Sequence, residues 1–219
     1  ENFDTTAAGS TSNATYPNCW SYIDDVTSTG YGYVLNSTTY AQSPTQSFRL
    51  YRTNSTTNAT EELVLISPET DNLGNGTKQL RFSVRSYLST YTNKLEIISL
   101  ADNTTTANAT VLATIYKDDT AYQEYIVPLP ATTDDYFAFR MAYNGLTAAS
   151  SVVIDDVYYE DLSPCIFPMN ITTSAITGNT ATISWNTSLA TGVTSYEYEI
   201  RTSGDAGSGT VGLETSGTV

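Results

Sequence analysis

Short runs of alternating apolar and polar residues, separated by polar turns, constrain this chain more than any other feature. Residues 79–84 place Leu80, Phe82 and Val84 on one side. Successive side chains of a strand point to opposite faces, so a period of two is typical of a half-buried β-strand. Asn and Gly within 72–76 and 144–145 tolerate positive φ and indicate turns. The other runs predicted as strands are 62–66, 94–100, 110–116, 123–129, 136–141 and 151–159.

Many short strands with frequent turns predict an all-β fold, a jelly roll or another β-sandwich. The pattern changes near residues 160–165. Two more predicted strands follow, at 181–185 and 195–201, and then a Gly/Ser-rich tail. The residues after the boundary are fewer than the roughly 100 of a seven-stranded sandwich. We therefore predict a domain at 1–161 and a truncated second sandwich at 162–219.

Charge and the absence of histidine argue against several functions. The chain has 23 acidic and 9 basic residues, a net charge of −14 and no histidine. Binding to nucleic acid or to an anionic membrane needs a basic patch. Ser-His and Cys-His catalysis and most zinc sites need an imidazole. Nothing singles out the paired carboxylates of a glycosidase, and no apolar run approaches the roughly 20 residues of a membrane helix. We expect neither catalysis nor membrane insertion.

The cysteines and the first residues bear on the compartment. Cys19 and Cys165 lie far apart in the sequence. A disulfide between them fits an extracellular protein, and two buried free thiols are the alternative. The opening, Glu1 to Asp4, is typical of a mature chain from which a leader has been removed. An extracellular or cell-surface protein is the expectation.

An ordered set of short motifs in residues 1–161 resembles the MAM domain and its bacterial relatives, the cleaved-adhesin and choice-of-anchor modules of Bacteroidota surface proteins. The low cysteine content is nearer to the bacterial branch. The motifs are Phe3-Asp4, Pro17-Asn18-Cys19-Trp20, Leu63-Val64-Leu65-Ile66-Ser67-Pro68, Leu80-Arg81-Phe82-Ser83-Val84, Leu95-Glu96-Ile97, Phe137-Ala138-Phe139-Arg140 and Val153-Ile154-Asp155-Asp156-Val157.

The segment 165–219 is similar to the first half of a fibronectin type III domain. The residues that carry this resemblance are 181–185, which end in Trp185, and 196–200. Together the two resemblances imply a jelly-roll sandwich, a structural calcium ion and a role in adhesion. We expect Trp20 and Trp185 to be core residues.

The resemblance places calcium between the first and last strands, on Asp4 and one residue of the pair Asp155 and Asp156. Neighbouring strand residues face opposite ways, so only one of the pair should turn inward unless a bulge intervenes. We prefer Asp156 as the ligand and keep Asp155 second. Asp24 or Asp25, in a nearby loop, is a further candidate ligand. The alternative is that these acids are ordinary solvated surface residues.

Several residues are candidate glycosylation sites. Nine Asn-x-Ser/Thr sequons occur, among them Asn54, Asn75 and Asn103; such sequons are N-glycan acceptors in secreted eukaryotic proteins. Thr5 and Thr120 follow an aspartate, which resembles the O-glycan sites of Bacteroidota.

Tyrosines offer a flat apolar face with a polar hydroxyl, on which sugar rings can stack. Tyr31, Tyr33 and Tyr40 lie in one polar stretch, and Tyr87 and Tyr91 lie in another. In strands, tyrosines more often pack between core and solvent.

These observations favour a non-catalytic, calcium-stabilised adhesion module that binds a glycan or protein through loops at one end of the sandwich. The second hypothesis is a spacer or filament subunit that assembles with copies of itself through sheet edges. The third is an accessory domain of a secreted hydrolase.

Overall fold

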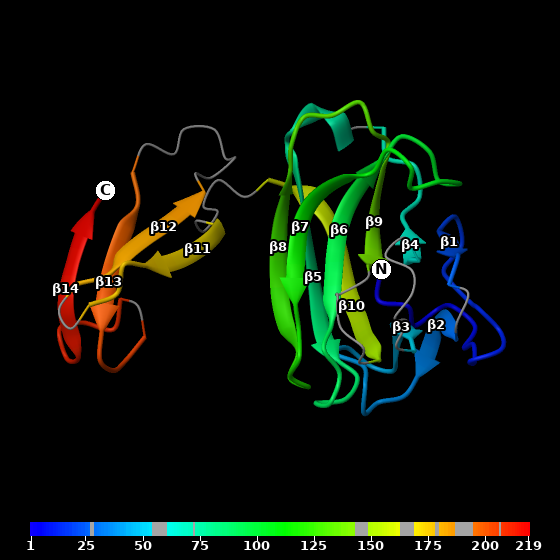
Figure 1. Cartoon of the computed structure of the whole chain (residues 1–219), viewed down its shortest axis with the longest axis horizontal. Coiled ribbons are helices and arrows are strands. Elements are labelled where there is room, and N and C mark those ends of the chain that lie inside the picture. Colours follow the sequence, from blue (N-terminus) through cyan, green and yellow to red (C-terminus); the bar gives the residue numbers. More distant parts are fainter. Residues whose placement is uncertain are drawn as a thin grey trace. The chain divides into compact units, whose positions relative to one another are not determined.

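The computed structural model describes residues 1–26, 29–53, 61–71, 73–142, 149–162, 169–177, 180–186, 195–205 and 207–219. The chain forms two compact units, Glu1–Asp161 and Leu162–Val219. Figure 1 shows that strands make up nearly all regular structure in both. Cys165 and Asn54 lie outside the described residues.

Two five-stranded antiparallel sheets form the first unit. One has the order β1-β4-β9-β6-β7, with β1 Ser21–Asp24, β4 Leu63–Ile66, β9 Tyr136–Met141, β6 Lys94–Leu100 and β7 Thr110–Tyr116. The other has the order β2-β3-β10-β5-β8, with β2 Gly30–Asn36, β3 Gln46–Arg52, β10 Ser150–Asp161, β5 Lys78–Ser86 and β8 Gln123–Leu129. A short 3₁₀ turn, η1 Leu73–Asn75, precedes β5. The predicted β-sandwich is confirmed.

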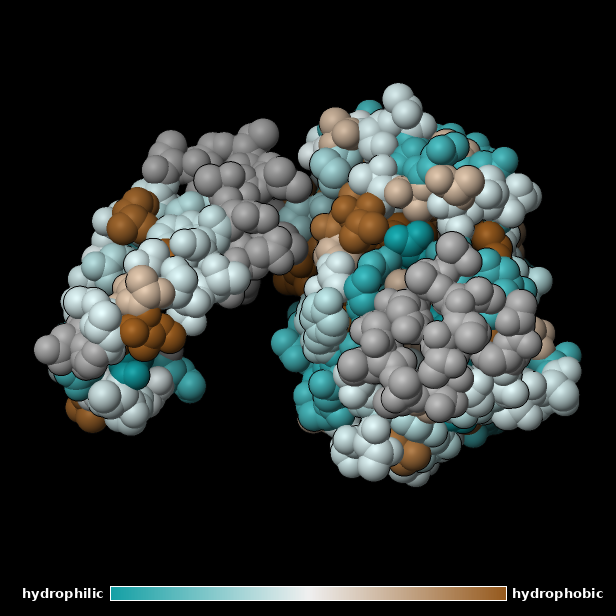
Figure 2. Space-filling model, in the orientation of Figure 1, coloured by the Kyte–Doolittle hydropathy of each residue, from teal (hydrophilic) through white to brown (hydrophobic). Residues whose placement is uncertain are grey.

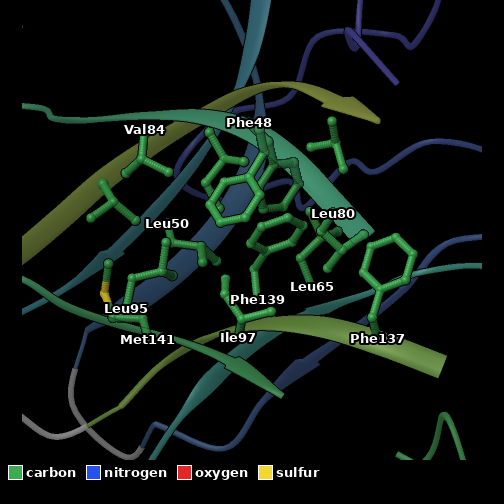
Figure 3. Packing of buried hydrophobic residues seen from close by; sticks show 14 of the residues in the cluster. Phe48, Leu50, Leu65, Leu80, Val84, Leu95, Ile97, Phe137, Phe139 and Met141 are labelled. Carbon is green, nitrogen blue, oxygen red and sulfur yellow. The ribbon is translucent and has the colours of Figure 1, made fainter. Parts of the chain in front are cut away.

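The core lies between the two sheets, where alternate residues of most strands turn inward. Figure 3 shows Phe48, Leu50 and Val84 from one sheet facing Phe139 and Ile97 from the other. Each of these five side chains is fully buried. Trp20 also belongs to this core, and its ring meets Phe137 edge to face at 5.9 Å.

The predicted strands from residue 62 onward are confirmed within one or two residues at their ends. Three strands of the first unit were not predicted: β1, β2 and β3. In the second unit, the strands Met169–Ser174 and Leu213–Thr218 were also not predicted. Glycine is depleted in strands, and β2 contains Gly30 and Gly32, so its sequence does not indicate a strand. Gly32 is needed here, because a Cβ at this position would come within 2.5 Å of the Tyr22 ring. This tertiary contact is invisible in the local pattern.

Strand β10 contains a bulge that determines where the two acids of its motif point. Its pairing with β5 shifts between Asp155 and Tyr158, and Asp156 has a φ of 51°. An extra residue in a strand changes which residues face inward. Ile154 and Val157 both face the core, so neither Asp155 nor Asp156 points into it.

The second unit consists of two separate antiparallel hairpins. One pairs β11 Met169–Ser174 with β12 Thr182–Asn186, and the other pairs β13 Glu197–Arg201 with β14 Leu213–Thr218. Trp185 is half-buried and meets Tyr196 edge to face at 5.8 Å. It lines an open groove with Ile183 and Tyr198, which are 45% and 41% exposed. Trp185 is therefore not in a closed core as predicted, since the described strands leave this apolar side open.

The surface in Figure 2 is mostly hydrophilic or neutral, with hydrophobic residues in separate patches. None of the described residues belongs to a helix long and apolar enough to cross a membrane.

Candidate functional site

The outer surface of the sheet β2-β3-β10-β5-β8 gathers tyrosine and arginine side chains. Tyr31 pairs with Tyr51, and Tyr33 pairs with Arg49, in the register of β2 and β3. Alternate residues share a face, and the opposite face of these strands carries the core residues Val34, Phe48 and Leu50. We call the outer surface the tyrosine face; it consists of Tyr31, Tyr33, Tyr40, Arg49, Tyr51, Arg85, Tyr87, Tyr91 and Tyr122.

The rings of the tyrosine face are ordered by stacking. Tyr31 and Tyr51 stack with centroids 4.6 Å apart and planes 18° apart. Tyr40 and Tyr87 stack at 4.3 Å and 14°, although they are 47 positions apart in the sequence. Such pairs contribute about 0.5–1.5 kcal/mol beyond the burial of area. Burial also raises the pKa of the Tyr31 hydroxyl, which therefore stays a neutral donor near pH 7.

Arg49 lies at the centre of this face. Its guanidinium carbon is 3.5 Å from the centroid of Tyr87 and 5.4 Å from those of Tyr31 and Tyr51. Nε donates to Ser151 Oγ at 3.1 Å, and Nη1 donates to Tyr33 Oη at 3.4 Å. Arg49 is 7% exposed. These partners are neutral, so the cation is held by ring faces and hydroxyl groups.

Arg85 occupies the same face on β5. The register places both Arg49 and Arg85 opposite Val153 of β10. Arg85 donates to the carbonyl oxygens of Ser86 and Thr39. Its guanidinium carbon is 5.2 Å from the ring centroid of Tyr40. Neighbouring strands lie about 4.8 Å apart and β10 lies between the two, so the backbones of the two arginines are about 10 Å from each other.

The predicted metal ligands Asp155, Asp156 and Asp4 hold the loop that carries Tyr40. This loop, residues 37–45, connects β2 with β3. Asp155 Oδ2 accepts hydrogen bonds from the backbone N–H of residue 42 at 2.8 Å and of residue 43 at 3.3 Å. Asp156 Oδ1 accepts one from the Ser43 hydroxyl at 2.8 Å. Asp4 Oδ1 accepts bonds from the N–H groups of residues 45 and 46, at 2.6 and 2.9 Å.

Asp155 is fully buried beneath this loop. Burial raises the pKa of its carboxyl to about 6, against the opposing effect of the backbone N–H groups that it accepts. Strand alternation predicts that only one of the pair turns inward unless a bulge intervenes, and Asp156 is the preferred ligand of the two. The bulge does intervene, and both acids face the 37–45 loop.

A hollow of about 400 Å³ lies beside Asp156. Its lining also includes Glu1, Asn2 and Ser43, which offer carboxylate, amide and hydroxyl oxygens. Calcium prefers six to eight oxygens of these kinds, so the donor chemistry fits this ion. Within the described ranges, no three Asp, Glu, Cys or His side chains cluster as a metal site. Amide, hydroxyl or water oxygens would have to complete the coordination.

Asp24 is not brought to this hollow. It pairs with Leu63 at the end of β1. Leu63 in turn lies close to Gly30, since a Cβ added at Gly30 would be 3.2 Å from the Leu63 side chain. Gly30 pairs with Arg52 at one end of β3, whereas Asp4 binds the N–H of Gln46 at the other end. Seven residues of strand separate these ends by about 20 Å.

The remaining predicted sites lie apart from the tyrosine face. Cys19 is exposed, and Cys165 is outside the described residues, so the disulfide stays a prediction. Thr5, Asn75 and Thr120 are exposed and Asn103 is partly exposed. Asn103 Nδ2 donates to Ser21 Oγ at 3.3 Å. Glycosylation of these residues also stays a prediction.

Five tyrosines of the tyrosine face were candidates from the sequence. The sequence did not single out Tyr51, Tyr122, Arg49 or Arg85 of this face, or Glu1, which lines the hollow beside Asp156. A signal for Arg49 and Tyr51 was present, because residues 46–52 alternate with Phe48 and Leu50. Recognising 30–36 and 46–52 as neighbouring strands would have placed Tyr31, Tyr33, Arg49 and Tyr51 on one face. Tyr40 and Tyr87 had no such signal, since their contact joins a loop to the residue after β5.

No protein-family model matches the sequence, and no curated protein matches it. Among solved structures, the K2 cleaved adhesin domain of Lys-gingipain aligns with a TM-score of 0.56 and 17% identity, over 73% of this chain and 97% of that one. The K1 cleaved adhesin domain of Lys-gingipain from Porphyromonas gingivalis W83 gives a TM-score of 0.54 and 17% identity, over 74% and 97%. These matches do not confirm the fibronectin type III resemblance of residues 165–219. Residues 1–161 have the jelly-roll β-sandwich fold of the cleaved adhesin domains, as their motifs predicted.

Proposed function

We propose that the first unit is a non-catalytic, extracellular binding module that recognises a glycan on its tyrosine face. The observation that carries the proposal is the pair of ring stacks, Tyr31 with Tyr51 and Tyr40 with Tyr87, arranged around Arg49. From β2 to β5 this face crosses three strand spacings, about 14 Å. The proposed binding surface therefore lies on a sheet, whereas the sequence led us to expect loops at one end of the sandwich.

The arrangement suits a sugar, whose ring has apolar C–H patches and hydroxyls at its edge. A tyrosine ring supplies a flat apolar surface, and its hydroxyl supplies a donor and an acceptor. The rings already pack on one another, so binding loses little side-chain entropy. Strands fix the positions of Tyr31, Tyr51 and Arg49 more firmly than a loop would.

The carboxylates support binding better than hydrolysis. A glycosidase needs two carboxyl groups on opposite sides of the scissile bond. Here Asp155 and Asp156 hold the backbone and side chains of the 37–45 loop. We assign them to the scaffold of the site.

A structural calcium ion beside this scaffold is part of the proposal. Asp156 and Glu1 would supply the charge, with oxygens of Asn2 and Ser43 completing the set. Asp156 Oδ2 and Glu1 Oε2 accept no hydrogen bond from a described residue. The ion would fix the first residues against β10 and thereby stabilise the 37–45 loop.

Tyr87→Ala tests the proposal. Removing this ring takes away the partner of Tyr40 and one face of the Arg49 contact, so we expect affinity for a bound polysaccharide to fall about tenfold. Affinity electrophoresis against a panel of neutral and acidic polysaccharides identifies binders, and calorimetry then measures Kd.

Tyr116→Ala is the matched control, because Tyr116 is 67% exposed and lies on β7 of the other sheet. Equal affinity for wild type and both variants would place the ligand elsewhere. If no polysaccharide binds and an extracellular matrix protein does, the glycan proposal is wrong and protein recognition replaces it.

A further inference from the structure

The basic residues of this chain divide into two groups. Seven of the nine lie within 4.0 Å of a carboxylate. The two that form no ion pair are Arg49 and Arg85, and the structure describes all 23 acidic residues of the chain. With so many acids available, an unpaired arginine is unexpected. Both unpaired arginines lie on the tyrosine face.

Arg49 is the more deeply buried of the two unpaired arginines. Moving a guanidinium out of water is costly unless it is paired with an anion. Ring faces and two hydroxyl groups offset only part of this cost. The third nitrogen, Nη2, donates no hydrogen bond to a described residue and is not among the fully buried unpaired atoms. It therefore keeps some exposure to solvent, although Arg49 as a whole is only 7% exposed.

Other outward-facing arginines of the first unit show how arginine is paired with acids in this chain. Arg140 on β9 donates to Glu96 at 2.6 Å and to Glu62 at 3.3 Å. Arg81, on β5 with Arg85, bonds Glu160 and Glu124 at 3.0 and 3.2 Å. The missing counter-charge is therefore specific to Arg49 and Arg85.

We infer that the tyrosine face binds an acidic glycan, whose carboxylate or sulfate groups are the counter-ions of Arg49 and Arg85. This inference rests on the proposed function. A guanidinium forms paired hydrogen bonds with planar oxyanions. Two cations that arise about 10 Å apart, with tyrosine rings around each, match a chain with anionic groups on separate sugars. Neutral polysaccharides would leave both cations unpaired.

Matched polymers test this inference with the full chain. Polygalacturonate is compared with its fully methyl-esterified form, and dextran sulfate with dextran. We expect at least tenfold tighter binding to one charged member than to its neutral partner, with affinity falling as salt rises. The galacturonan arm reports carboxylate recognition and the dextran arm reports sulfate recognition.

Three variants locate the effect. Arg49→Gln and Arg85→Gln should each reduce affinity for the charged polymer about tenfold or more. Arg81→Gln removes the same charge from the same strand, but an ion-paired one, and should change affinity less than twofold. Arg85 is only partly buried, so its variant keeps the test valid if Arg49→Gln fails to fold. Circular dichroism confirms folding.

The outcomes separate the two proposals. Equal binding of charged and neutral polymers, weakened in Tyr87→Ala, would overturn the acidic-glycan inference and keep the glycan function. An equal loss in Arg81→Gln would reduce the effect to net charge and also overturn the inference. Absence of binding to every polymer would contradict both proposals.

Discussion

At the scale of single residues, Arg49 and Arg140 show opposite solutions for an arginine on the outer surface of a sheet. Arg140 is neutralised by Glu62 and Glu96. Burial alone would raise the pKa of Glu96, but Lys94 and Arg140 outweigh it and hold that pKa below its usual value. Arg49 has tyrosine rings and hydroxyl groups instead of an acid. The two residues should therefore differ in what they contribute to stability.

Replacing each arginine with methionine tests this difference. Arg140→Met leaves Glu96, 6% exposed, with only Lys94 as an ionic partner, and should cost roughly 2–3 kcal/mol of unfolding free energy. Arg49→Met removes an unpaired cation and should cost less than about 1 kcal/mol, or stabilise the fold. Urea denaturation at pH 7 measures both. A larger loss for Arg49→Met would mean that Arg49 is kept for stability.

At the scale of elements, the bulge in β10 and the 37–45 loop together determine where Tyr40 lies. The bulge turns Asp155 and Asp156 toward the loop, and the loop places Tyr40 on Tyr87. The two acids, both predicted calcium ligands, thus hold the tyrosine face in place. An excess residue in one strand decides this, because without it one of the two acids would face the core.

Asp155 predicts an unusual pH dependence of stability. Its folded-state pKa of about 6 exceeds the unfolded value of about 3.9, so the folded state binds this proton more tightly. Its stabilising contribution is complete below about pH 4 and is lost as pH rises through 6. The chain has no histidine, so few other groups titrate between pH 5 and 7.

In calcium-free buffer, the melting temperature of the wild type should therefore be higher at pH 5 than at pH 7. Asp155→Asn should remove most of this difference, since the amide cannot titrate. Asp24→Asn, at the other end of the sandwich, should retain it. A melting temperature that is flat or rises from pH 5 to pH 7 in the wild type would contradict the assignment of a raised pKa to Asp155.

At the scale of the whole molecule, the two units differ in how they bury apolar surface. The first encloses its core between two five-stranded sheets. In the second, Ile183, Tyr198 and Ile200 are each more than 40% exposed. Two-stranded hairpins are marginally stable by themselves in water. Ligand effects on global unfolding should therefore report chiefly on the first unit.

Calcium should stabilise that unit if it binds beside Asp156. An ion that binds only the folded state adds RT ln(1 + [L]/Kd), about 2.7 kcal/mol at a hundredfold excess over Kd. We expect added calcium to raise the melting temperature of metal-stripped protein by several degrees at pH 7. Asp156→Ala should abolish the rise and Asp24→Ala should not. An unchanged melting temperature in the wild type would remove calcium from the proposal.

The sequence by itself determined the fold class and most strand positions, because a period of two and turn residues are local signals. It also excluded histidine chemistry and supplied the motifs that resemble the cleaved adhesin modules. Only the tertiary structure decided which side chains meet. Tyr40 stacks on Tyr87 across a loop, and the 3.5 Å contact of Arg49 with Tyr87 joins β3 to the end of β5. The absence of a counter-ion is also a tertiary property, since it depends on where every acid of the chain lies.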